Sequence, residues 1–502
     1  MRARDGHPPD PAGPNPTHPN PAHPNPAPPN PGDLTGPRSA QVSAGPGTTR
    51  PTDTARPAGR SAATPTPDRE ILALAVPALG ALVAEPLFLL ADSAIVGRLG
   101  TVPLAGLGIA AAVLATAVNV FVFLAYGTTA AVARRIGSGD RAAAVGQGID
   151  GMWLAVLLGA ATSLAGWAAA GRVVGLFHAE PQVAEQAVTY LRWSLPGLPA
   201  MLVVLAATGV LRGLQDTRTP LAVAATGSAV NAGLNLLLVH GLRLGIAGSA
   251  LGTALTQVGM AAALVVVVVR GARRLGAPMR PDRAGVWASG RSGVPLLVRT
   301  LALRAALLAT TNAAAAQSAA GLAAYQVSST VWTLLALALD ALAIAGQALT
   351  GRALGAGDIR GARAATRRML VWGVGAGAVF GALLLLGRDL VPAAFTHDPA
   401  VRRALLAALV VVAVAQPLCG YVFVLDGVLI GAGDGRFLAV AGVVQVVGYL
   451  PLTVAVVRLA PTGTMGLVWL WIAFAGGYML LRAVFLGLRE RSDAWLVTGA
   501  TR

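Results

Sequence analysis

Few ionisable side chains lie within the long apolar stretches of this 502-residue sequence, and these few are the candidates for chemistry. Asp92 lies toward the far end of one stretch, and Asn231 and Asn235 lie four residues apart in another. A spacing of four places both amides on the same face of a helix. A carboxyl group beside two amides can bind and release a proton, or provide oxygen ligands for a sodium ion. We therefore expect these three residues to form a cation-binding site, with a structural hydrogen-bonded cluster as the alternative.

A different polar set occupies the apolar stretches of the second half. It consists of Arg299, Arg304, Asp340 and Asp426. An arginine in lipid needs a counter-ion, and either aspartate could supply it. Two interpretations stay open: a structural ion pair, or a contact with a substrate in a cavity. Tyr126 and Thr253 are further candidates for lining a cavity.

Proline interrupts the stretch that contains Asp92. Pro77 and Pro86 each remove a backbone donor and permit a kink. We expect a hinge that couples protonation of Asp92 to bending, with a static bend that improves packing as the alternative. Glu85 lies two turns before Asp92 on a similar face, and is either a second titrating group or a packed, protonated one.

The composition indicates that these residues are carried on membrane-spanning helices. Hydrophobic residues make up 55% of the chain and charged residues only 12%, whereas soluble proteins carry about 25% charged residues. Twelve apolar stretches reach the roughly 20 residues needed to cross a bilayer. The sequence therefore predicts an all-α polytopic membrane protein with twelve transmembrane helices. The predicted spans are 70–98, 104–133, 147–171, 186–212, 218–240, 246–270, 289–316, 322–351, 366–388, 403–430, 436–458 and 464–488.

The second half of the sequence repeats the first at a distance of 218 residues, so that Asp140 corresponds to Asp358. A repeat of this length in a hydrophobic chain predicts two pseudo-symmetric lobes of six helices, with a site at or near their interface. The predicted segments are 69–270 for the first lobe, 271–288 for a cytoplasmic linker and 289–490 for the second lobe.

The candidate polar residues are not themselves repeated. Asp92 corresponds to Thr310, and Asn235 corresponds to Thr453. The backbone plan is duplicated while the polar chemistry is not, so these groups are not a general requirement of the fold.

The placement of arginine predicts the orientation. All 38 basic residues are arginine, giving a net charge of +16, and they concentrate in the loops after even-numbered spans. The positive-inside rule places those loops and both termini in the cytoplasm. Aromatic residues do not interleave with the arginines, so we expect no nucleic-acid partner. The terminal segments are a disordered, proline-rich cytoplasmic tail over 1–68 and a short cytoplasmic tail over 491–502.

Several short motifs, in order along the chain, resemble those of the multidrug and toxic compound extrusion (MATE) family. The motifs lie at residues 85–100, 209–217, 247–250, 345–348 and 424–427. The first resembles the signature of the family's first helix, and the last two are similar to its DinF-like branch. The resemblance covers residues 70–488.

This resemblance implies twelve helices in two lobes, alternating access, and export coupled to the entry of protons or sodium ions. Asp92 matches the family's carboxylate on the first helix, and Asn231 and Asn235 match its polar pair on the fifth. The sodium-type branch carries acidic residues on the seventh span, where this chain has Arg299 and Arg304. That difference disfavours a cation site in the second lobe.

The resulting functional expectation is a secondary active antiporter in the cell membrane. It would export small drugs or metabolites, often cationic or amphipathic, in exchange for H⁺ or Na⁺. We expect a monomer, with no cofactor besides the coupling ion. One alternative is a flippase for lipid-linked oligosaccharides from the same broader superfamily. A polytopic membrane enzyme is a weaker alternative, because the spans lack a His/Glu metal pattern and a Gly-x-Ser-x-Gly elbow.

Overall fold

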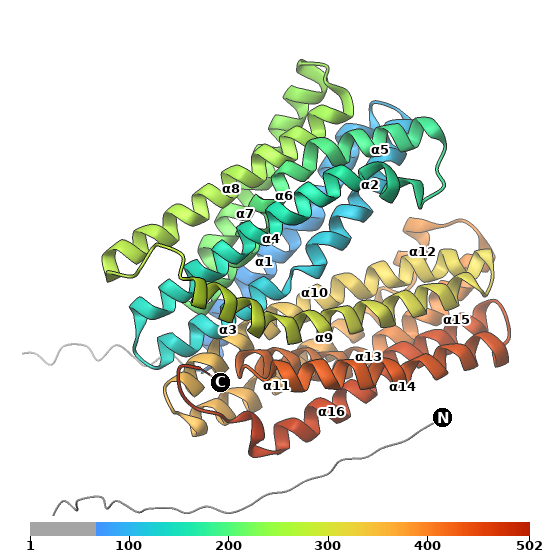
Figure 1. Cartoon of the computed structure of the whole chain (residues 1–502). Coiled ribbons are helices and arrows are strands. Elements are labelled where there is room, and N and C mark those ends of the chain that lie inside the picture. Colours follow the sequence, from blue (N-terminus) through green and yellow to red (C-terminus); the bar gives the residue numbers. More distant parts are fainter. Residues whose placement is uncertain (1–66, 502) are drawn as a thin grey trace, which may run out of the picture. The chain divides into compact units, whose positions relative to one another are not determined.

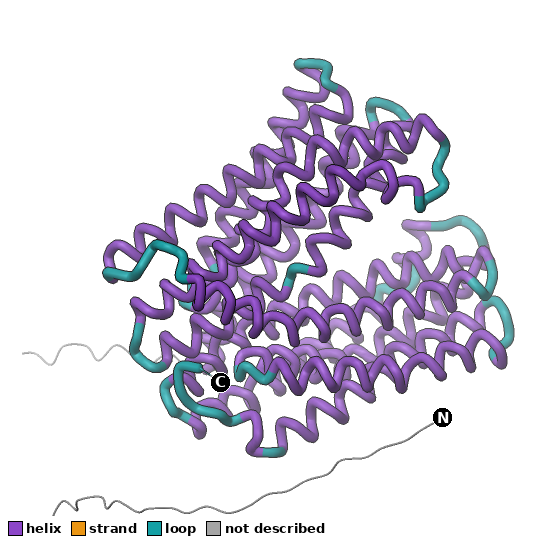
Figure 2. The backbone as a smooth tube through the Cα atoms, viewed as in Figure 1, coloured by secondary structure: helices purple, strands orange, loops and turns teal. Residues whose placement is uncertain are grey.

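The computed structural model describes residues 67–501, and every structural statement below concerns this part of the chain. The tail predicted over 1–68 lies outside the described residues except at its end, where the first helix already begins at Pro67. The described residues form helices and short loops without a strand (Figure 2). The α-helices are α1 (Pro67–Gly97), α2 (Thr101–Val120), α3 (Phe123–Gly137), α4 (Arg141–Gly175), α5 (Pro181–Ser194), α6 (Leu198–Gly213), α7 (Arg218–Asn235), α8 (Gly245–Leu275), α9 (Arg283–Ala315), α10 (Ala319–Gly355), α11 (Ile359–Leu386), α12 (Leu390–Phe395), α13 (Pro399–Gly431), α14 (Gly435–Leu459), α15 (Thr464–Trp471) and α16 (Met479–Arg491). Short 3-10 and π segments complete the list: η1 (Leu195–Gly197), η2 (Leu236–Gly241), η3 (Ile472–Tyr478) and η4 (Asp493–Trp495).

Twelve helical segments of the described chain are long and apolar enough to cross a membrane, which confirms the number of predicted spans. Three crossings are built from two α-helices each: α2 with α3, α5 with α6, and α15 with α16. The protein is therefore a multi-pass, all-α membrane protein.

The connection between the sixth and seventh crossings is shorter than predicted. Helix α8 continues to Leu275 and α9 begins at Arg283, so the loop covers 276–282 rather than 271–288. Gly276 ends α8 in the left-handed conformation, and the Asp282 carboxylate caps the first turn of α9. Arg273 and Arg274 lie on the last turn of α8 and Arg283 begins α9, so of the arginines in the predicted linker that precede α9 only Arg280 lies in the loop.

The helix boundaries follow the 218-residue repeat. The crossing Thr101–Gly137 corresponds residue for residue to Ala319–Gly355, and Pro181–Gly213 corresponds to Pro399–Gly431. Figure 1 shows the two sets as separate bundles, which we call the first lobe (α1–α8) and the second lobe (α9–α16). The repeat is not perfect, because the second crossing breaks after α2 at Phe121 while α10 is continuous.

The two lobes meet at one end and separate toward the other (Figure 1). At the meeting end, α3 and α10 cross where Gly137 and Gly355 each lie against the other helix. A Cβ atom added at Gly137 would overlap the carbonyl oxygen of Arg352, and one at Gly355 would overlap that of Arg134. These glycines are equivalent in the repeat. We call this the arginine-rich end, because it carries the arginine-rich loops after even-numbered crossings.

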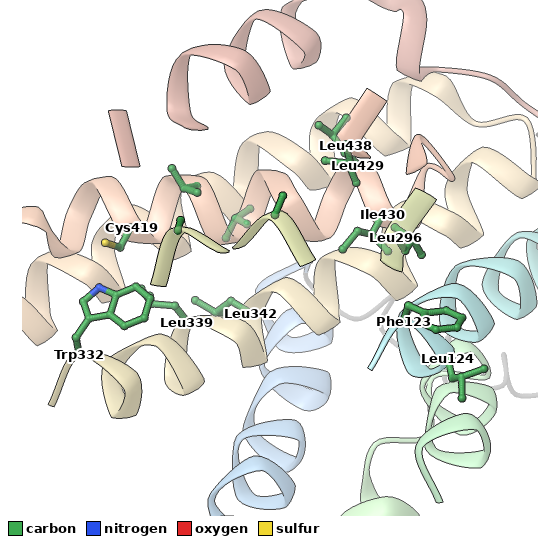
Figure 3. Packing of buried hydrophobic residues seen from close by; sticks show 14 of the residues in the cluster. Phe123, Leu124, Leu296, Trp332, Leu339, Leu342, Cys419, Leu429, Ile430 and Leu438 are labelled. Atoms are coloured by element: carbon green, nitrogen blue, oxygen red, sulfur yellow. The ribbon is translucent and has the colours of Figure 1, made fainter. Parts of the chain in front are cut away.

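Packing within the second lobe combines buried apolar side chains with close backbone contacts. Trp332 of α10 lies beside Cys419 of α13 in the buried layer (Figure 3). Gly373 and Gly377 of α11 lie directly against the α13 backbone. In lipid, close packing of this kind is a main source of helix association, since apolar burial alone gives little preference for another helix.

Candidate functional site

Asp92 lies at the centre of a buried polar cluster inside the first lobe. The residue is only 2% exposed. The amide of Asn235 donates to Asp92 Oδ1 at 2.8 Å, and Ser249 Oγ donates to the same oxygen. The hydroxyl of Tyr190 donates to Asp92 Oδ2 at 3.0 Å. Four helices supply these groups: α1, α5, the end of α7 and the start of α8.

The second layer of the cluster contains Asn231 and Thr253. The Asn235 amide also donates to Asn231 Oδ1 at 3.2 Å, and the Asn231 amide donates to Thr253 Oγ1 at 3.3 Å. Thr253 is therefore part of the Asp92 cluster, whereas the sequence suggested it for a cavity wall. Gly252 leaves space for the side-chain carbonyl oxygen of Asn235. A Cβ atom at position 252 would overlap this oxygen.

One oxygen of the cluster has no hydrogen bond. Asn235 Oδ1 is buried and accepts none from any described residue. Asn235 is the last residue of α7, where the chain passes into the π-helical segment η2. A buried carbonyl oxygen without a donor is a group that a cation or a hydroxyl donor would satisfy.

Among the described residues, no positive side chain pairs with Asp92 to offset its charge. Its described partners are an amide and two hydroxyls, all of them neutral. An ionised carboxylate is costly in a low-dielectric interior unless a proton or a bound cation neutralises it. The cluster can therefore exist in a cation-loaded and an unloaded form, and the two differ in charge.

The second lobe holds an ion pair rather than a single carboxylate. Arg299 of α9 donates through Nε to Asp426 Oδ1 at 3.1 Å, and its Nη2 contacts Asp426 Oδ2. Arg482 of α16 approaches Asp426 Oδ2 at 3.4 Å. All three side chains are largely buried. Arg482 is a functional candidate that the sequence analysis did not identify.

A second cluster of polar side chains lies between the two lobes near this ion pair. Asp340 of α10 lies within hydrogen-bonding reach of Tyr126 of the first lobe, and close enough to Arg212 of the first lobe and Arg299 of the second for their charges to act on it. The guanidinium of Arg299 lies 5.9 Å from the Tyr126 ring centroid, within cation–π range. Tyr126 therefore lies between the lobes, and Arg212 is a second partner that the sequence did not single out.

The remaining predicted residues lie apart from both groups. Arg304 is exposed and forms no ion pair with a described acidic residue, so only Arg299 of the two predicted arginines is paired. Glu85 is also exposed and has no hydrogen bond among the described residues. Pro77 and Pro86 lie inside α1, which continues through both as one helix.

Twelve crossings, an internal repeat and a buried carboxylate in one lobe define a polytopic membrane protein of the transporter class. The sequence profile of the MatE family matches residues 77–237 and 295–455, one match in each lobe, and the chain belongs to this family. The family prediction is thereby confirmed. Members of this family are transporters, so the interpretation as a membrane enzyme is dropped.

Individual relatives span most of the chain. Protein DETOXIFICATION 44, chloroplastic, of Arabidopsis thaliana is 30% identical over 447 residues, covering 85% of this chain and 81% of that protein. DNA damage-inducible protein F of Escherichia coli is 27% identical over 299 residues, covering 58% and 64% respectively. A solved structure described as the outward-facing conformation of a multidrug resistance MATE family transporter has a TM-score of 0.77 at 22% identity, covering 86% of this chain and 97% of that chain. This structural likeness shows the fold.

Proposed function

We propose that this protein is a secondary active antiporter that exports small organic molecules in exchange for a proton or a sodium ion bound at Asp92. The observation that carries the proposal is the Asp92 cluster: a buried carboxylate with three neutral donors and no positive partner among the described residues. An isolated charge of this kind in a membrane span is retained for function, since a structural role could be filled at lower cost by uncharged groups.

The cluster also has the chemistry to respond to loading. Ser249 and Tyr190 bear hydroxyls, which can turn from donating to accepting when Asp92 gains a proton. The amide NH₂ of Asn235 can only donate, so a proton on Asp92 Oδ1 would conflict with it. Binding of a proton to Asp92 can therefore follow one of two routes. Either Asn235 rearranges at the junction of α7 and η2, or the proton binds at Oδ2 and the Tyr190 hydroxyl rotates.

Loading at Asp92 would be transmitted through α1. This helix carries Asp92 in its outer part and packs at its other end against the second lobe, where Ala78 contacts Ala341 and Ile344. Pro77 and Pro86 lie between the start of α1 and Asp92, and each leaves a carbonyl of the helix without its usual donor. We propose that these prolines form the hinge by which loading changes the contact between the lobes.

The direction of opening follows from the charge distribution. The positive-inside rule assigns the arginine-rich end to the cytoplasm, and with it both termini. The lobes meet at that end, so this conformation is closed to the cytoplasm and corresponds to the outward-facing state of an alternating-access cycle. We propose the cell membrane as the location and the monomer as the transporting unit.

The substrate class we propose is small drugs or metabolites, often cationic or amphipathic. It rests on family membership and on the multidrug resistance transporter whose fold this chain shares. The groups between the lobes, Tyr126 and Asp340 among them, offer an aromatic face and a carboxylate to such molecules.

Transport by purified protein in liposomes tests the proposal. The lumen is loaded with a cationic dye, an uncharged drug or an organic acid, and a proton or a sodium gradient is imposed in separate trials. We expect export of at least one class under one of the two gradients and little movement without a gradient. Equal movement with and without either gradient, for every substrate class, would overturn the antiporter proposal.

A further inference from the structure

A cavity lies at the arginine-rich end, at the opposite end of the helices from Asp92. It has a volume of about 970 Å³ and opens between the start of α9 and the start of α14, beside the end of α16. These three helices belong to the second lobe (Figure 1). Its lining combines three arginines with one acidic and several apolar side chains. The residues used below are Arg291, Arg436, Arg489, Asp434, Phe437 and Val440.

The arginines of this cavity outnumber its carboxylate. Arg489 Nε donates to Asp434 Oδ2 at 2.6 Å, and the Arg489 guanidinium lies 4.9 Å from the Phe437 ring centroid. Arg489 is therefore already held in place. Arg291 and Arg436 are exposed, and neither pairs with an acidic residue in the described chain. Two positive charges are left to face the cavity.

This charge is not required by the fold, because the internal repeat supplies a comparison. The equivalent positions in the first lobe, 218 residues earlier, are Ala73 for Arg291, Arg218 for Arg436 and Gly271 for Arg489. The first lobe folds in the same way with only one of the three arginines. The positive-inside rule also acts on both lobes alike, so it does not account for the difference.

The surroundings of the cavity have the polarity of a membrane interface. Trp287, one turn before Arg291 on α9, is 74% exposed, as expected for an aromatic side chain at the level of the headgroups. Below the arginines, α14 presents an exposed apolar strip toward the membrane interior. The strip consists of Val440, Val443, Val444 and Val447, which are 65%, 46%, 44% and 62% exposed.

We propose that this cavity binds an anionic phospholipid, with its phosphate between Arg291 and Arg436 and an acyl chain along the α14 strip. Guanidinium groups match phosphate oxygens in geometry and charge. Basic pockets between transmembrane helices at the cytoplasmic side are suited to acidic lipid headgroups. Charge complementarity and the adjoining apolar strip together favour a lipid over a soluble anion. The inference stands independently of the transport proposal.

Native mass spectrometry of the full-length protein in detergent measures this binding directly. The probes are phosphatidylglycerol, phosphatidylcholine and inorganic phosphate. We expect one phosphatidylglycerol to bind more tightly than phosphatidylcholine. The double variant Arg291→Gln/Arg436→Gln should weaken that binding about 30-fold, since each arginine near a membrane surface contributes about a factor of five.

A matched control is Arg172→Gln/Arg458→Gln, which removes two exposed arginines at the opposite end, one of them on α14 itself. This control should bind phosphatidylglycerol as the unmodified protein does. Thermal unfolding without added lipid checks that both double variants are folded. Equal phosphatidylglycerol affinity in the two double variants would overturn the proposal. So would binding of inorganic phosphate with the same affinity as the lipid, because the acyl strip would then contribute nothing.

Discussion

Asp92 and Asp426 are both buried carboxylates, and they differ in what surrounds their charge. Two arginines share Asp426, whereas the hydrogen-bond partners of Asp92 in the described part of the chain are an amide and two hydroxyls. A carboxylate already neutralised by guanidinium groups gains little from binding a further cation, while an unpaired one gains much. This difference supports our proposal that the coupling cation binds in the first lobe, and it favours a structural ion pair at Asp426.

The structural role of Asp426 can be tested by removing it. Asp426→Ala leaves Arg299 and Arg482 buried without their shared counter-ion, which should cost about 3–5 kcal/mol. We expect a clear fall in thermal stability in detergent and in the amount of folded protein, with Asp426→Glu better tolerated. Arg304→Gln serves as a control, because Arg304 is exposed and unpaired among the described residues. Normal stability of Asp426→Ala together with lost transport would instead make Asp426 a substrate contact.

The sequence identified the central residues of these groups more readily than their partners. Asp92 and Asn235 stand out because polar side chains are rare in apolar spans. Ser249 and Tyr190 do not stand out, since hydroxyl side chains are compatible with a membrane helix at many positions. Arg482 lies close enough to the end of its span to resemble a topology signal. Which of these side chains meet depends on tertiary contacts between α1, α5, α7 and α8, which no local pattern encodes.

At the scale of the helices, the contact between α3 and α10 depends on two equivalent glycines. A Cβ atom at Gly137 or Gly355 would overlap a backbone carbonyl of the other lobe, and such overpacking costs about 1–3 kcal/mol. The variants Gly137→Ala and Gly355→Ala should therefore move the lobes apart at the arginine-rich end. Distances between spin labels at Arg141 and Ile359 measure this, and we expect a longer, broader distribution.

A glycine without neighbours provides the comparison. Gly108→Ala on α2 should leave the label distances unchanged, because a Cβ atom there has no described atom within 4 Å. Unchanged distances in Gly137→Ala as well would show that the α3–α10 contact does not hold the lobes together.

The number of membrane crossings and their helical type could be predicted because length and hydropathy determine them, but the ends of the helices could not. Arginines such as Arg273 and Arg283 suggested a loop, yet they lie on helical turns at the ends of α8 and α9. A helix that leaves the bilayer keeps its hydrogen bonds in water, so a change in polarity marks the membrane boundary rather than the end of the helix.

At the scale of the whole molecule, the C-terminal segment connects the two lobes. The sequence suggested only a cytoplasmic tail over 491–502. In the structure Trp495 is 0% exposed, and Gly499 donates its backbone N–H to the carbonyl of Leu354 in α10. Arg134 of the first lobe donates to the carbonyl of Val497 at 2.7 Å and to that of Ala432 at 3.0 Å. The two Arg134 bonds cross between the lobes, so opening of the arginine-rich end would have to break them.

Removal of residues 496–502 should therefore favour opening at that end while keeping the buried Trp495. A cysteine at Ala131, which lines a cavity of about 300 Å³ together with Ala500 and Thr501, reports the change. In a Cys419→Ala background, we expect its reaction with a water-soluble thiol reagent to become several-fold faster after truncation. A cysteine at the exposed Leu386 should react at one rate in both chains. No acceleration at position 131 would mean that the segment does not hold the lobes closed.

The role of Asp92 in coupling is tested by comparing gradient-driven export by Asp92→Asn with that by the unmodified protein in liposomes. The amide keeps the size and much of the hydrogen bonding of the carboxyl, so folding and substrate binding should persist while the coupling ion loses its site. We predict that export driven by a proton or sodium gradient falls to the level of empty liposomes, and that substrate binding to the detergent-solubilised variant stays within a few-fold of normal. Undiminished gradient-driven export by Asp92→Asn would show that the coupling ion binds elsewhere, and would contradict the account.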